Sequence, residues 1–149
     1  MSAFERLRQS MNDLVASIEE ARPRRLVAKS NPENLKPIIR KLLADFKEDF
    51  YLDFLAVVDY VDEKQIEVNY NFWIYSLKTL LTVKFRLPRE NPSIDTISDL
   101  IPSAVNHEKE AYDLMGVTFQ GNTDLARGFL VTEEAQDSFP LRKDEAKQP

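Results

Sequence analysis

Cysteine is absent from this chain of 149 residues, histidine occurs once and glycine three times. Without thiols the chain can form no disulfide, no cysteine nucleophile, no iron–sulfur ligand set and no thiolate zinc site. A single histidine also excludes a histidine-rich metal centre. Only a carboxylate-dominated site for a hard cation remains open to this composition.

Long apolar runs are absent as well. Hydrophobic residues make up 43% and charged residues 30% of the chain, as in an ordinary globular protein, and no run is long enough to span a bilayer. The N-terminal "MSAFERLRQS" carries charges and lacks the apolar core of a signal peptide. We therefore expect a cytoplasmic protein whose residues 1–149 form a single domain with a hydrophobic core.

Excess positive charge is also missing, since the net charge is −5 and the pI is about 5.0. An acidic chain lacks the basic face that nucleic acid requires. The aromatic residues Phe72, Trp73 and Tyr75 suggest base stacking, but their alternation in a strand favours core and edge packing. We expect no nucleic-acid partner, and membrane association only through protein partners.

Helical spacing of apolar residues predicts two N-terminal helices. The first covers residues 2–21 and ends before Pro23, which gives an N-terminal helical segment of 1–22. The second runs from Asn34 to about Lys47. With Asn34 as N-cap, Pro37 occupies the third helical position, where its missing N–H costs no intrahelical bond.

Period-2 alternation predicts strands at 25–30, 54–62, 66–76 and 78–88. The last three would form an antiparallel meander, and the two helices can cover its apolar face. A final helix is predicted from Ser103 to just before Gly116, followed by a short extended segment. The predicted fold is α+β, with an antiparallel or mixed sheet covered by helices and an extended, partly flexible tail at 135–149.

The segment "HEKEAYDLMGVTFQG", residues 107–121, concentrates acidic residues. Glu108 and Glu110 lie about 200° apart on a helix, whereas Glu110 and Asp113 share a face. Acids near a helix C-terminus oppose the helix dipole and need cations, for which Arg127, Arg142 and Lys143 are candidates. Three interpretations stay open: a solvated face, a partner-binding surface, or a stand-alone enzyme or divalent-metal site at Glu110 and Asp113. No base, nucleophile or phosphate-binding glycine loop completes an active site.

A longer pattern extends over the C-terminal half of the chain. The motifs "EKEAYDLMGVTFQG", "TDL" and "PLRKDE" together resemble the hallmark region of the C subunit of respiratory complex I, the NADH dehydrogenase. They are also similar to the matching subunit of energy-converting membrane-bound nickel–iron hydrogenases. The resemblance spans about Leu77 to Asp144. Lys109 replaces the usual arginine, and Asn122-Thr123 stand where His-Pro is usual. The compact form favours a hydrogenase-type complex over an NADH-oxidising one.

The resemblance implies a subunit of an oxidoreductase complex that is not catalytic by itself and holds no cofactor. It would sit in the hydrophilic arm, peripheral on the cytoplasmic side of the membrane, against the large subunit and other arm subunits. Iron–sulfur clusters and the quinone site or nickel–iron centre are expected in those partners. The residues that the resemblance assigns to partner binding are Glu108, Glu110, Tyr112, Asp113, Phe119, Asp124, Leu141, Arg142, Lys143 and Asp144.

Overall fold

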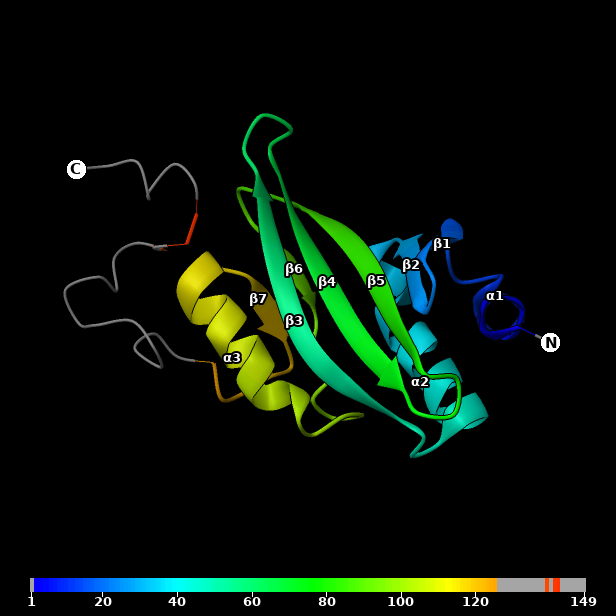
Figure 1. Ribbon diagram of the computed structural model, residues 1–149. Helices are drawn as coiled ribbons and strands as arrows, with labels where there is room; N and C mark the ends of the chain where they lie inside the picture. The colour runs from blue at the N-terminus through cyan, green and yellow to red at the C-terminus, as the bar shows by residue number, and fades with distance from the viewer. Residues whose placement is uncertain (1, 126–138, 140, 143–149) are drawn as a thin grey trace.

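A computed structural model describes residues 2–125, 139, 141 and 142, and its centre is a five-stranded mixed sheet (Figure 1). The strand order is β1-β2-β5-β4-β3, and a separate parallel pair joins β6 to β7. The strands are β1 Ser17–Arg22, β2 Arg25–Ser30, β3 Phe50–Tyr60, β4 Gln65–Ile74, β5 Thr79–Pro88, β6 Ser93–Asp95 and β7 Thr118–Gln120. The helices are α1 Ala3–Met11, the 3-10 turn η1 Pro32–Asn34, α2 Leu35–Phe46 and α3 Ala104–Met115. The predicted α+β class is confirmed.

The antiparallel meander β3-β4-β5 forms as predicted. Tyr70 pairs with Val83 and Val68 with Phe85, so the alternating apolar side chains of β4 and β5 share one face and are fully buried. Strand β2 then pairs in parallel with β5. That pairing brings residues 25–30 beside 80–85, a contact between distant segments that local periodicity does not encode.

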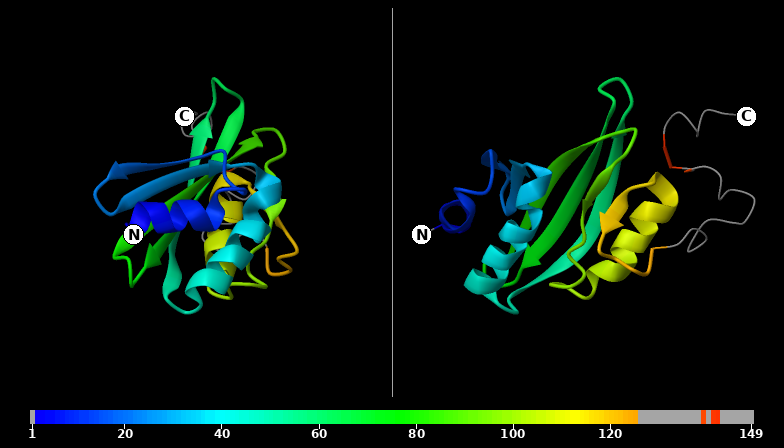
Figure 2. Two further views of the ribbon diagram at one scale, coloured as in Figure 1. Left: turned by 90° about the vertical axis from the view of Figure 1, so that its right-hand side faces the viewer. Right: turned by 180° about the vertical axis from the view of Figure 1, so that it is seen from behind.

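Helices α2 and α3 cover the same apolar face of the sheet (Figure 2). Ile38, Ile39 and Leu42 of α2 are fully buried there. The sequence predicted that the first two helices cover this apolar face, but α2 and the last helix, α3, cover it. Helix α1 packs on α2 and β1 at the edge of the sheet, where Leu7 and Met11 are fully buried.

The predicted helix over 2–21 is wrong beyond Met11. Residues 17–22 form β1, which pairs with β2 in the register Ser17↔Lys29. The apolar residues Val15 and Ile18 still pack against the core, and the β-branched side chain of Ile18 suits a strand that can pair with the edge of β2. Helix α2 has the predicted bounds, although the Asn34 side chain makes no cap hydrogen bond.

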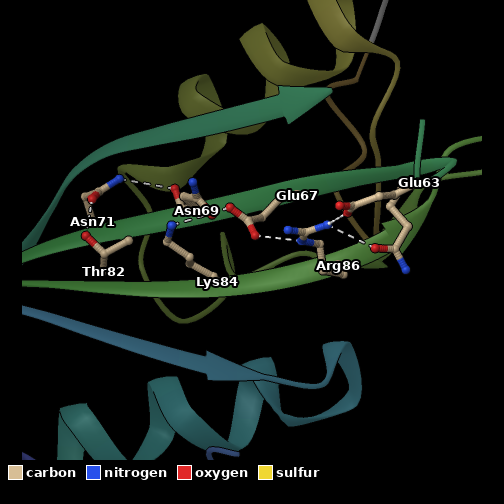
Figure 3. A network of polar contacts seen from close by, with 8 residues as sticks. Glu63, Glu67, Asn69, Asn71, Thr82, Lys84 and Arg86 are labelled. Carbon is tan, nitrogen blue, oxygen red and sulfur yellow. Dashed lines mark hydrogen bonds and ion pairs between the residues drawn. The ribbon is translucent and has the colours of Figure 1, made fainter. Parts of the chain in front are cut away.

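The opposite face of the sheet carries no helix in the described part of the chain (Figure 1). A polar network occupies its centre (Figure 3). Glu67 is 3% exposed and accepts from Arg86 Nε at 2.7 Å, while Lys84 Nζ lies 3.6 Å away. Thr82 donates to Asn71 at 2.5 Å. We call this surface the open face.

No helix of the described residues has both the length and the apolar character to cross a bilayer.

Candidate partner-binding site

Helix α3 and the strand after it carry most of the predicted partner-binding residues. The helix begins after Ser103 and ends at Gly116, as predicted, although the Ser103 side chain makes no cap hydrogen bond. Gly116 adopts φ 77°, a left-handed conformation that favours glycine and stops the helix. The reversal lets β7 pair with β6, which precedes α3 in the chain.

Glu108 is fully buried within the chain itself. Its carboxylate accepts from Thr96 Oγ1, from the Ile97 backbone N–H at 2.9 Å and from Asn122 Nδ2 at 2.9 Å. Desolvation raises the pKa of Glu108, and the three hydrogen bonds oppose that rise. The sequence assigned Glu108 to partner binding. In the structure its side chain links α3 to the segments after β6 and β7, and its part in partner binding stays a prediction.

Asn122 is a hydrogen-bond partner of Glu108 that the predicted site did not include. It is 9% exposed, donates to Glu108, and accepts from the Asp124 backbone N–H at 2.9 Å. This position usually carries histidine in the families that the signature resembles. The side-chain amide of asparagine can donate a hydrogen bond to Glu108, as a histidine ring could. The departure from the usual histidine was the sequence signal that could have identified Asn122.

The remaining predicted residues divide by exposure. Asp113 and Phe119 are 0% and 1% exposed, whereas Glu110, Asp124 and Leu141 are exposed and Tyr112 is half-buried. Asp113 and Phe119 are therefore buried within this chain, and their part in partner binding stays a prediction. Lys143 and Asp144 lie outside the described residues.

The two acids of the predicted carboxylate site do not share an environment. Glu110 is exposed and Asp113 is buried, although they are three positions apart on α3. Within the described ranges no group of three histidine, aspartate or glutamate side chains could hold a metal ion. The described residues around α3 therefore do not bring Glu110 and Asp113 together as one carboxylate site.

Part of the tail contacts the C-terminal end of α3. Arg142 Nε donates to the Met115 carbonyl at 2.8 Å, and its guanidinium lies 5.0 Å from the Phe139 ring centroid. A Cβ at Gly116 would lie 2.8 Å from Phe139 Cε2, so only glycine permits this close approach. Arg142 thus supplies a cation to the helix end, where the dipole favours positive charge.

A groove lies where α3 meets β3, and we call it the α3 groove. Its volume is about 320 Å³. It is lined by Leu55, Val57, Glu110, Ala111, Leu114, Met115 and Leu141. Most of these side chains are apolar, Glu110 is the charged one among them, and Leu141 is 58% exposed. An exposed apolar groove with one charged side chain is typical of a protein–protein contact.

The fold and the signature around α3 define a subunit of a complex I-like respiratory complex. The chain belongs to the family described as "Respiratory-chain NADH dehydrogenase, 30 Kd subunit", whose model matches residues 28–149. It is 31% identical to the C subunit of the NADH-quinone oxidoreductase of Roseiflexus sp. (strain RS-1), over 96% of this chain and 82% of the relative. It is 28% identical to the C subunit of the F(420)H(2) dehydrogenase of Methanosarcina mazei, over 82% of this chain and 76% of that protein.

Two solved structures share the fold. A chain of the membrane-bound sulfane sulfur reductase, an archaeal respiratory membrane complex, superposes with a TM-score of 0.84 at 25% identity and covers 94% of this chain and 83% of its own length. A trypsin-resistant fragment of Nqo5 gives a TM-score of 0.64 at 25% identity, over 81% of this chain and 95% of the fragment. These similarities confirm the family resemblance in the sequence and the mixed α+β sheet.

Proposed function

We propose that this chain is a non-catalytic subunit in the hydrophilic arm of a complex I-like membrane oxidoreductase. It docks through the α3 groove on the large subunit that carries the quinone site or the nickel–iron centre. The observation that carries the proposal is the groove itself. Apolar Leu141 stands exposed beside the floor formed by Leu55, Val57 and Leu114, with the Glu110 carboxylate among them.

The residues behind the groove support this role by fixing its shape. Glu108 and Asp113 lie inside, so α3 is held from its buried side. The Arg142 side chain and the Leu141 backbone N–H, which donates to Leu114 O at 3.2 Å, hold residues 141 and 142 beside α3. A pre-organised groove loses little conformational entropy on binding, which favours affinity.

The kind of complex is the finer part of the proposal. The names of the relatives include an NADH-quinone oxidoreductase, an F(420)H(2) dehydrogenase and a sulfane sulfur reductase complex. The departures at Lys109, Asn122 and Thr123 favour a hydrogenase-type or other non-NADH complex. Iron–sulfur clusters would reside in partner subunits, and the complex would hold the chain at the cytoplasmic face of the membrane. A neighbouring reading frame with paired CxxC motifs for nickel would support the hydrogenase type, and a quinone-type large subunit would contradict it.

Substitutions in the groove test the docking. Leu141→Glu places a charge where apolar contact is required, and we expect it to lower recovery of the chain with an affinity-tagged large subunit roughly tenfold. Glu110→Arg should have a smaller effect of the same sign, because a charge at an interface rim contributes less.

Glu20→Arg on exposed β1 is the matched control and should leave recovery unchanged. The thermal unfolding midpoint of each isolated variant should stay within a few degrees of wild type, since all three side chains are exposed. Equal recovery of Leu141→Glu and Glu20→Arg would refute docking through the groove.

A further inference from the structure

Four aromatic side chains gather at one end of the open face, and we call them the aromatic patch: Tyr51, Phe54, Trp73 and Tyr75. Tyr51 pairs with Trp73 across β3 and β4, and Phe54 stands opposite Asn71, the next open-face position of β4. The Tyr51 and Tyr75 ring centroids are 5.4 Å apart. Tyr51, Phe54 and Tyr75 are 41%, 44% and 54% exposed, so the rings face solvent together.

Other aromatic rings of this chain are covered by its own arginines. The Arg86 guanidinium lies 3.9 Å from the ring centroid of Tyr60, at the far end of β3, and Arg6 lies 4.8 Å from that of Phe46. Within the described residues no guanidinium or ammonium group lies over a ring of the aromatic patch. The patch therefore offers free ring faces, which attract a cation.

Three acidic residues lie in or next to the chain segments that carry the patch. Asp53 is exposed at the β-bulge between Leu52 and Phe54, and Glu48 and Asp49 directly precede β3. Asp53 lies two positions after Tyr51 in β3, and desolvation, followed by the charge of Asp53 and by Tyr75, raises the pKa of Tyr51. The three acids outnumber Lys47 and Lys78 of the adjoining turns, so three negative and two positive charges leave one net negative charge.

We propose that the aromatic patch receives an arginine-bearing segment of another protein subunit of the same complex. A guanidinium can stack on the tyrosine rings while it pairs with the Asp53 carboxylate, a combination that a lysine ammonium reproduces less well. Clustered tyrosine, phenylalanine and tryptophan side chains supply the apolar contact area that dominates binding at interfaces. The inference rests on the proposed function and adds a second docking surface, on the face of the sheet opposite the α3 groove.

Photo-crosslinking in the purified complex tests this inference. The probe is p-benzoylphenylalanine, placed at Tyr75 in the full chain and, as a control, at exposed Val61 in the turn at the other end of β3. Irradiation followed by peptide mapping should join position 75 to a segment of a different subunit that contains arginine. Position 61 should not capture that segment. A cross-link to a second copy of this chain, to lipid, to a segment without arginine, or to nothing would overturn the proposal.

Substitutions then measure the contribution of the patch. Tyr75→Ala should lower recovery of the chain in the complex about tenfold, Asp53→Asn should lower it less, and Tyr75→Phe, which keeps the ring, should retain most of it. Unfolding of each isolated variant establishes that the domain is intact. Wild-type chain that fails to join any large subunit would refute the proposed function. If the wild-type chain and Tyr75→Ala are recovered in the complex to the same extent, the aromatic-patch inference is refuted and the proposed function is not.

Discussion

Glu108 joins three separate segments through one carboxylate. It sits on α3 and accepts hydrogen bonds from Thr96, Ile97 and Asn122, which follow β6 and β7. The spacing of Glu108 and Glu110 correctly predicted that they lie on different sides of the helix. The spacing alone does not show which of the two sides faces the protein interior. These three hydrogen bonds explain how the carboxylate can be buried, because a buried charge without partners would cost too much free energy.

Glu108 should make stability depend on pH. The pKa of its carboxyl is raised in the folded chain above the ordinary 4.5, so folding favours the protonated form. Its contribution is fully present below about pH 4.5 and is lost as pH rises through the raised pKa. We expect the unfolding free energy of wild type minus that of Glu108→Gln to fall with pH above 4.5, by at most about 1.4 kcal/mol per pH unit.

Urea unfolding from pH 4 to pH 7 measures this difference. The control is Glu110→Gln, on the exposed side of the same helix, which should change the unfolding free energy by no more than about 0.5 kcal/mol throughout. A wild-type advantage that grows with pH would contradict the prediction, because it would mean that the three hydrogen bonds outweigh desolvation.

At the scale of elements, a buried ion pair joins the end of β3 to the segment after β5. Asp59 accepts from Arg89 Nε at 2.7 Å and from Arg89 Nη2 at 3.0 Å, and its side chain is 1% exposed. This bidentate contact fixes the two chain segments relative to each other across β4. Neither residue stood out in the sequence, because they are thirty positions apart.

Removing the cation of this pair should be costly. Arg89→Ala leaves the Asp59 carboxylate buried without its bidentate partner, and we expect a loss of about 3–5 kcal/mol in unfolding free energy. The surface pair Lys36–Asp99, at 3.0 Å with Asp99 54% exposed, supplies the control. Lys36→Ala should cost less than about 1 kcal/mol. Urea denaturation compares the two, and equal losses would contradict the assignment of Asp59–Arg89 as a buried structural pair.

The whole molecule is a sheet with two unlike faces. One face is covered by α2 and α3, with the α3 groove at its β3 edge. The open face carries the polar network around Glu67 and the aromatic patch at one end. The two binding surfaces that we propose therefore lie on opposite faces of one sheet layer, which is the geometry expected of a subunit held between neighbours in a larger complex.

If the two surfaces contact different parts of the complex, their contributions should be independent. The double variant Leu141→Glu, Tyr75→Ala should then show the product of the single losses in recovery, about a hundredfold, because free energies at distant sites add. Affinity capture with the tagged large subunit at equal expression measures all four chains. A double variant no weaker than either single variant would mean that both surfaces serve one contact.

The sequence by itself determined much of the local structure. The bounds of α2 and α3 were predicted from apolar spacing and from Gly116, although Asn34 and Ser103 make no side-chain cap hydrogen bond, and the meander follows from the alternation in residues 66–88. The family was recognisable as well, because the signature around residues 108–125 is a local pattern of residue types. These features depend on neighbours within a few turns of chain.

Tertiary structure decided the rest. Residues 17–22 became a strand because β2 offered an edge to pair with, which outweighed their helical spacing. Glu108 and Asp113 were buried while Glu110 stayed at the surface, although all three share one acidic motif. Whether a side chain faces a partner or the interior depends on which distant segment packs against its helix, and local sequence patterns do not encode that contact.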